Sequence, residues 1–122
     1  MSNRRTVVAV IDDDPHFLDA MDHLLSAYGY DTELHPSAEA FLETAPESKA
    51  ICLIVDVQLG GSSGIELGRQ LAKSGFKFPI IFMTGSGDEH IERRAMETGC
   101  VAFLRKPFSA VVLIEALNRS TQ

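Results

Sequence analysis

The sequence has no apolar run long enough to cross a membrane, since its longest runs are 51–55 and 101–104. It has only two cysteines, Cys52 and Cys100, and they lack the spacing of a metal site, which is typical of a protein in a reducing cytoplasm. Positive charge is also scarce, because 11 lysines and arginines face 17 aspartates and glutamates, for a net charge of −6. These absences argue against a membrane protein and against a nucleic-acid-binding surface.

No linker, repeat or low-complexity segment divides the chain. Its 122 residues, of which 45% are hydrophobic, suit one domain with a buried core. Apolar runs of strand length alternate with segments of helical period along the whole sequence. We expect strands at 7–11, 32–35, 51–55, 79–83 and 101–104, and helices at 17–28, 37–45, from 65 to Gly75, from about 88 to Gly99 and at 109–118.

Strands that alternate with helices predict an α/β fold, in which a parallel sheet carries helices on both faces. Right-handed crossovers leave few topologies for five such units. We predict a flavodoxin-like, doubly wound (βα)5 single domain over residues 1–122, with strand order 2-1-3-4-5, a core of about 7–119 and short tails. In this topology the ligand site lies at the carboxyl ends of strands 1 and 3.

Three predicted helices begin with recognisable caps. Asp14 precedes Pro15, and an aspartate followed by proline is a favoured helix start. The segments 63–66 and 86–89 have the Ser-x-x-Glu pattern of a capping box. We therefore assign Asp14 to capping rather than to chemistry.

Polar side chains follow the strands at the points where they end. Asp12 and Asp13 follow the first strand, Asp56 the third, Thr84 the fourth and Lys106 the fifth. Because the carboxyl ends of parallel strands meet at one edge of the sheet, we expect these side chains to share one cleft. A simpler interpretation is that the aspartates only end strands and cap helices. Acids on both sides of the switch point make that interpretation the weaker one.

Clustered carboxylates repel one another unless a cation lies among them, and hard oxygen ligands suit Mg²⁺. A carboxylate beside Mg²⁺, with a lysine and a threonine facing it, suits phosphoryl transfer through an acyl phosphate. Asp56 is the better candidate nucleophile because it stands alone at its strand end. Asp12 and Asp13 form a pair better placed to hold the metal ion.

These residues and their neighbours resemble a known family, the receiver domains of two-component response regulators. The likeness extends from Val7 to about Arg119 and is greatest to the FixJ-type receivers. It rests on positions that occur in the family's order and spacing: Ile11-Asp12-Asp13, Asp56 with Gly64 eight residues on, Thr84-Gly85-Ser86-Gly87-Asp88, and Lys106-Pro107-Phe108.

The resemblance implies a role for each residue of the predicted cleft. It implies that Asp56 accepts a phosphoryl group from a histidine kinase or a small phosphodonor. It further implies that Asp13, Asp56 and the backbone carbonyl of Gln58 bind Mg²⁺, with Asp12 acting mainly through water. Lys106 would contact the phosphoryl group.

The same resemblance implies a switch and some structural positions. Thr84 would move toward the phosphoryl group, and Phe103 would turn inward as it moves. The peptide bond before Pro107 would be cis, which proline permits at a cost of only ~0.5–1 kcal/mol. Gly64 and Gly85 would be structural.

The sequence departs from the family after the acceptor. Most members carry a Met-Pro or similar pair there, whereas this chain has Leu59-Gly60 within a loop that extends to Gly64. Glycine in place of proline enlarges the loop ensemble, at roughly 0.4–1 kcal/mol. We expect a more mobile loop without loss of activity.

The predicted function is a phosphorylation-dependent signalling switch in the cytoplasm rather than an enzyme. Its partners would be a sensor histidine kinase and, through a surface over about 88–119, an output protein or a second copy of itself. An aspartyl-phosphate phosphohydrolase is an alternative, but it needs a general acid two residues after the nucleophile, where this chain has Gln58. An unphosphorylated scaffold is a third interpretation, against which the complete set of phosphotransfer residues argues.

The remaining reactive residues suggest no second site. His16, His23, His35 and His90 are dispersed without a zinc-binding pattern, and we interpret His16 and His23 as solvent-exposed helix residues. The two cysteines are interpreted as small core residues.

Overall fold

The computed structural model describes residues 5–60, 62–85 and 87–120. Five parallel strands form one sheet in the order β2-β1-β3-β6-β7, which confirms the predicted order and the flavodoxin-like class. The strands are β1 (Thr6–Ile11), β2 (Tyr30–His35), β3 (Ala50–Asp56), β6 (Ile80–Thr84) and β7 (Ala102–Arg105). The helices are α1 (Pro15–Ala27), α2 (Ala38–Thr44), α3 (Gly64–Lys73), α4 (Glu89–Glu97) and α5 (Ala110–Ser120), with a short 3-10 helix η1 (Ala45–Glu47).

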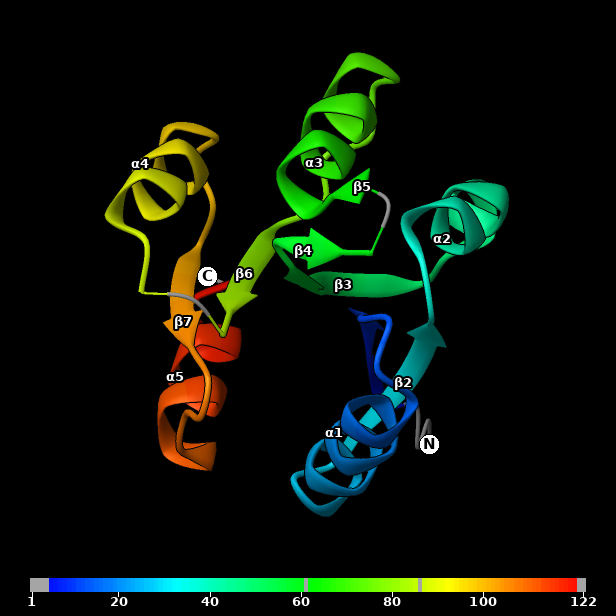
Figure 1. The fold of residues 1–122 in the computed structure, drawn as a ribbon. Helices are drawn as coiled ribbons and strands as arrows, with labels where there is room; N and C mark the ends of the chain where they lie inside the picture. Colours follow the sequence, from blue (N-terminus) through cyan, green and yellow to red (C-terminus); the bar gives the residue numbers. More distant parts are fainter. Residues whose placement is uncertain (1–4, 61, 86, 121–122) are drawn as a thin grey trace.

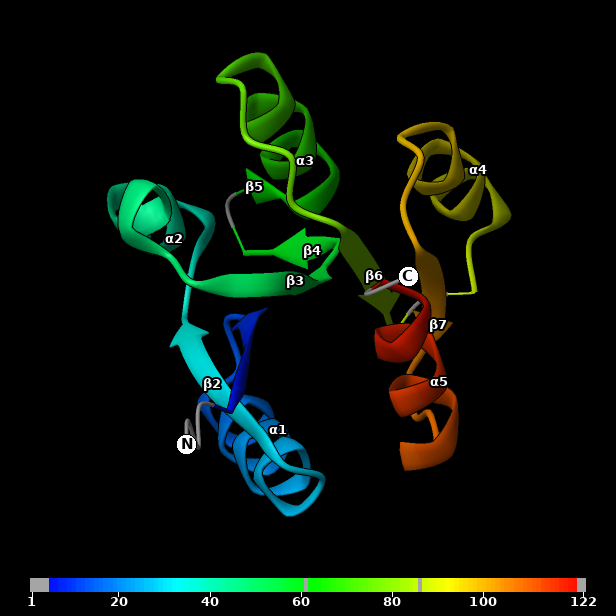
Figure 2. The same cartoon turned by 180° about the vertical axis from the view of Figure 1, so that it is seen from behind.

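The sheet lies between two layers of helices, with α1 and α5 on one face and α2, α3 and α4 on the other (Figures 1 and 2). Alternate residues of a strand point to opposite faces. On β1, Val8 and Val10 pack against the layer of α1 and α5, whereas Ala9 and Ile11 pack against the other. All four are fully buried, which explains why this strand is a continuous apolar run.

The helix starts agree with the sequence, and only the capping residue of α4 differs. Asp14 caps α1 by accepting a hydrogen bond from the His16 amide at 2.9 Å, and Ser63 caps α3 in the same way. For α4 the prediction of Ser86 as the cap is wrong. The cap is Asp88, whose carboxylate directly precedes the helix and accepts from the His90 amide, and Ser86 itself lies outside the described residues.

A small antiparallel ladder follows β3 that the sequence did not predict. It joins β4 (Gln58–Leu59) to β5 (Ser62–Ser63), and the buried Leu59 anchors it to the core. Two-residue strands are too short to produce a period that a sequence pattern can reveal. Gly60 has φ +61°, a left-handed value that the ring of a proline cannot adopt. Proline could therefore not occupy position 60 with this backbone.

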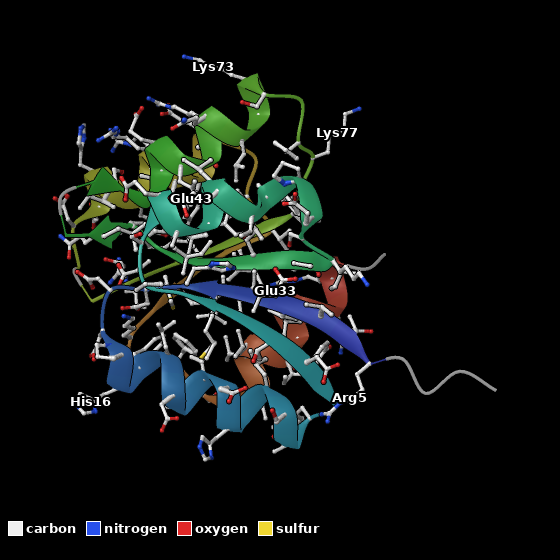
Figure 3. All side chains as sticks on the ribbon, turned by 90° about the vertical axis from the view of Figure 1, so that its right-hand side faces the viewer. Arg5, His16, Glu33, Glu43, Lys73 and Lys77 are labelled. Carbon is white, nitrogen blue, oxygen red and sulfur yellow. The ribbon has the colours of Figure 1, made fainter. Side chains whose placement is uncertain are left out.

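The positions of two histidines agree with the sequence analysis. His16 points away from the protein at the start of α1 (Figure 3), and His23 is also exposed on that helix. Within the described residues, no helix combines the length and apolar character needed to span a bilayer.

Candidate functional site

Lys106 forms ion pairs with acids at the carboxyl ends of β1 and β3. Its Nζ donates to Asp12 Oδ2 and to Asp56 Oδ2, each at 2.8 Å. Asp12 follows β1, Asp56 ends β3 and Lys106 follows β7, so residues up to 94 positions apart meet at one sheet edge. The predicted cleft at the carboxyl ends of the strands is therefore present for these three side chains.

Backbone amides hold the second oxygen of each carboxylate. Asp12 Oδ1 accepts from the Asp14 amide at 2.9 Å, and Asp56 Oδ1 accepts from the Gln58 amide at 2.8 Å. Asp12 is 1% exposed and Asp56 is 7% exposed. Because both carboxylates are buried, their orientation depends on these local bonds and on the one ammonium between them.

Burial and ion pairing both shift the pKa values of Asp12 and Lys106. Burial raises the pKa of Asp12, and this effect exceeds the lowering by the hydrogen bonds from Lys106 and from the Asp14 amide. Burial acts in the opposite sense on Lys106, but its hydrogen bonds to Asp12 and Asp56 outweigh it, so the pKa of Lys106 is raised. Lys106 is therefore a cation at neutral pH, despite being partly buried.

An open hollow of about 650 Å³ lies over these groups. Its lining includes the three aspartates 12–14, Asp56, Gln58, Gly60 and Lys106. Asp13 is exposed, and its Oδ2 lies 3.3 Å from where a side chain on Gly60 would begin. The hollow is open to solvent, and its mainly acidic lining attracts a cation rather than an anion.

The oxygen donors of the hollow fit Mg²⁺ in chemical type. They include the carboxylates of the aspartates at 12–14 and 56, and carboxylate oxygens are among the hard ligands that Mg²⁺ prefers. No three His, Cys, Asp or Glu side chains of the described residues lie close enough to hold a metal ion as they stand. Asp12 and Asp56 point to Lys106, whereas Asp13 lies beside Gly60, so bringing these acids onto one ion requires side-chain rotation.

Thr84 and Phe103 lie on neighbouring strands and on the same face of the sheet. Thr84 is 1% exposed at the end of β6, and its carbonyl accepts from the Lys106 amide at 2.8 Å. Phe103 on β7 is half-buried and is paired in register with Phe82, two residues before Thr84. Since side chains alternate along a strand, both point to the layer of α2, α3 and α4. A backbone hydrogen bond thus joins Thr84 to Lys106, and Phe103 lies on the same face of the sheet as Thr84.

Gly64, Gly85 and Pro107 are the residues to which the sequence analysis gave structural roles. A Cβ on Gly64 would collide with the carbonyl oxygen of Asp56, so α3 begins against the backbone of the candidate acceptor. Gly85 is different, because among the described residues a Cβ there would meet nothing within 4 Å, and its φ is not left-handed. Those residues give no steric reason for glycine at 85. The Lys106–Pro107 peptide bond is cis, as predicted.

One neighbour of the cluster was missed by sequence reasoning. The ring of Phe17, on α1, lies under Lys106 with Nζ 4.0 Å from the ring centroid. In the sequence Phe17 is only the first member of an apolar stripe of helical period, which is typical of core packing. No local pattern distinguishes a stripe residue that also contacts a cation.

Comparisons with known proteins identify the same family over most of the chain. The sequence model of the response regulator receiver domain matches residues 8–118. The response regulator protein TodT of Pseudomonas putida is 38% identical over 118 residues, covering 97% of this chain and 52% of TodT. The transcriptional regulatory protein FixJ of Bradyrhizobium diazoefficiens is 40% identical over 118 residues, covering 94% of this chain and 58% of FixJ.

A solved structure shows the same likeness in three dimensions. The crystal structure of FixJ-N has 34% sequence identity and a TM-score of 0.89, covering 97% of this chain and 94% of that one. This chain spans about half the length of the curated relatives that it matches.

Proposed function

Because the chain belongs to the response regulator receiver domain family, as a FixJ-like member, we propose that it is a phosphorylation switch with Asp56 as its acceptor. Receiver domains are signalling domains of two-component systems rather than classical enzymes. The single observation that carries the proposal is the Lys106 ammonium, 2.8 Å from both Asp12 and Asp56 on the floor of an open acidic hollow.

The proposed reaction is an in-line transfer to a carboxylate. A carboxylate oxygen of Asp56 forms a bond to phosphorus while the bond from phosphorus to the donor's histidine nitrogen breaks. That nitrogen leaves with the electron pair, and the donor becomes a neutral imidazole when the other ring nitrogen carries a proton before the transfer. Lys106 faces the negative charge on the transferred group, and the amide of Gln58 keeps the acceptor carboxylate oriented.

The proposal includes a magnesium ion held by Asp13, Asp56 and the Gln58 carbonyl, with Asp12 acting mainly through water. When bound, Mg²⁺ supplies positive charge to the oxygens of the phosphoryl group. The roles of the protein groups are to present oxygen donors to the hollow and to pair the two buried acids with the Lys106 ammonium. The lining supports this, since all four of these residues border the same hollow.

The signal would leave the site through Thr84 and Phe103. A new phosphoryl group carries up to two negative charges, which attract the Thr84 hydroxyl and the Lys106 ammonium. Movement of Thr84 frees space on the face that Phe103 shares, which couples a local charge to packing at a distance. We infer that the surface of α4, β7 and α5 then changes its affinity for an output protein or for a second copy. The proposed setting is the cytoplasm, with a sensor histidine kinase as donor.

Labelling with acetyl phosphate and Mg²⁺ tests the acceptor. We expect intact-mass spectrometry to show one added phosphoryl group that hydroxylamine removes, and Asp56→Asn to abolish it. Asp14→Asn is the matched control, because Asp14 borders the same hollow but caps α1, and it should label normally. Label that persists on Asp56→Asn contradicts the proposal, and continuous release of phosphate from small phosphate esters would indicate a phosphohydrolase instead.

A further inference from the structure

The ammonium of Lys106 has a third partner besides its two carboxylates. Its Nζ lies 4.0 Å from the centroid of the Phe17 ring, while donating to Asp12 and Asp56. The face of an aromatic ring carries negative electrostatic potential and attracts a cation at this distance. The ring comes from α1, whereas all the other groups of the cluster lie at strand ends.

Phe17 is itself held in place by the core. It packs against the cluster of apolar residues between the sheet and the layer of α1 and α5. The ring of Phe108 meets it edge-on, with centroids 6.3 Å apart and an interplanar angle of 79°. Asp14 fixes the first turn of α1 only three residues earlier. The ring is therefore a fixed surface rather than a mobile side chain.

Without the Phe17 ring, few contacts would hold the ammonium of Lys106 in one position. Its four-carbon stem is flexible, and the Lys106 side chain is 23% exposed. Two hydrogen bonds direct the ammonium to the carboxylates, but they leave its other side open to water. The Phe17 ring covers part of that side without competing for a hydrogen bond, so it favours the one position between Asp12 and Asp56.

We propose that Phe17 is a positioning residue for Lys106, so that phosphoryl transfer to Asp56 depends on α1 as well as on the strand ends. This inference rests on the proposed function of the site. It assigns Phe17 no contact with the phosphoryl group. It acts only through the place and orientation of the Lys106 ammonium.

The contact itself can be measured in the wild-type protein. Protons above an aromatic ring are shifted upfield in NMR spectra, so the ε-methylene protons of Lys106 should resonate upfield of those of the exposed Lys73. Phe17→Leu should abolish the shift and Phe17→Tyr should keep it. An ordinary Lys106 shift in the wild-type protein overturns the proposal, whether or not any variant folds.

The functional test compares initial rates of labelling by acetyl phosphate at saturating Mg²⁺. Phe17→Leu should be about 2- to 30-fold slower, the range that a cation–π contact supports. Phe17→Tyr, which keeps the ring, should recover to within about twofold of wild type. Phe108→Leu removes the ring that packs edge-on against Phe17 but leaves the Phe17 ring itself beside Lys106, so it should slow labelling less than Phe17→Leu does.

Urea unfolding of each variant separates positioning from packing. If Phe17→Leu and Phe108→Leu slow labelling equally, in step with their loss of stability, Phe17 is a core residue only and the proposal is overturned. It is also overturned if Phe17→Leu labels at the wild-type rate. Asp56→Asn is included in every assay, since label on that variant contradicts the proposed function regardless of how Phe17 behaves.

Discussion

Removal of the Lys106 charge tests the electrostatics of the site directly. Lys106→Met keeps most of the apolar stem but leaves Asp12, which is 1% exposed, and Asp56, which is 7% exposed, without their shared cation. The carboxylates stay buried, because backbone amides hold each of them by its second oxygen. The free energy of unfolding of the variant should therefore fall, because two buried negative charges lose their shared cation.

The size of the effect follows from burial. Loss of one partner from a fully buried ion pair costs about 3–5 kcal/mol. Because the Lys106 side chain is 23% exposed, water reaches the cluster and screens part of this cost. We expect the free energy of unfolding at pH 7 to fall by about 2–3 kcal/mol. The surface variant Lys73→Met, whose side chain extends from the end of α3 (Figure 3), should change it by less than about 0.5 kcal/mol.

The pH dependence has a definite sign. Burial already raises the pKa of Asp12 above its ordinary value of 3.8, and loss of the Lys106 hydrogen bond raises it further. An acid whose pKa is higher in the folded protein binds a proton more readily there, so this group destabilises the fold increasingly as pH rises from 3.8 through the raised value. The deficit of Lys106→Met should thus be greatest near neutral pH and shrink as the pH is lowered toward 3.8.

Urea unfolding followed by circular dichroism measures both effects. Wild type, Lys106→Met and Lys73→Met are compared at neutral pH and at a pH near 4. A deficit at neutral pH no larger than that of Lys73→Met would refute the idea that the ammonium compensates two buried charges. A deficit that grows on acidification would refute the assigned direction of the pKa shift.

Three further predictions concern glycines and a thiol. Gly64→Ala should lose about 1–3 kcal/mol of unfolding free energy in urea titrations, because its Cβ meets the Asp56 carbonyl, and wild-type stability would contradict that packing. Gly60→Ala and Gly75→Ala should each lose about 1–2 kcal/mol from their left-handed backbones, but only Gly60→Ala should also weaken Mg²⁺ binding in calorimetric titrations. Burial raises the pKa of Cys52 to about 11, so iodoacetamide at pH 8 should modify it only after unfolding, as judged by peptide mass spectrometry.

The sequence was sufficient for the sheet because the signal for each strand is local. Fully buried strand segments such as 8–11 require continuous apolar residues, and this requirement is visible without any knowledge of the neighbours. Caps are similarly local, as Asp14 shows. Where two capping residues compete within three positions, as Ser86 and Asp88 do, the pattern cannot decide which backbone amide each one reaches.

The sequence predicted that the site lies at the carboxyl ends of the strands, and it predicted which residues lie there. Parallel strands with right-handed crossovers bring Asp12, Asp56 and Lys106 to one edge, whatever the side chains do there. Topology therefore predicts where the candidate acceptor and the candidate lysine lie, whereas their roles were predicted from their chemistry and from the family resemblance.

Only the tertiary structure decided how those groups contact one another. That Lys106 joins Asp12 to Asp56, that Asp13 lies beside Gly60 instead, and that Phe17 adjoins the ammonium depend on rotamers selected by packing between distant elements. A sequence pattern specifies the face of an element to which a side chain belongs, because the period of a helix or strand is fixed. The atom that it meets there depends on the other elements, since close packing leaves each side chain few allowed positions, and the neighbouring elements determine which of them remains.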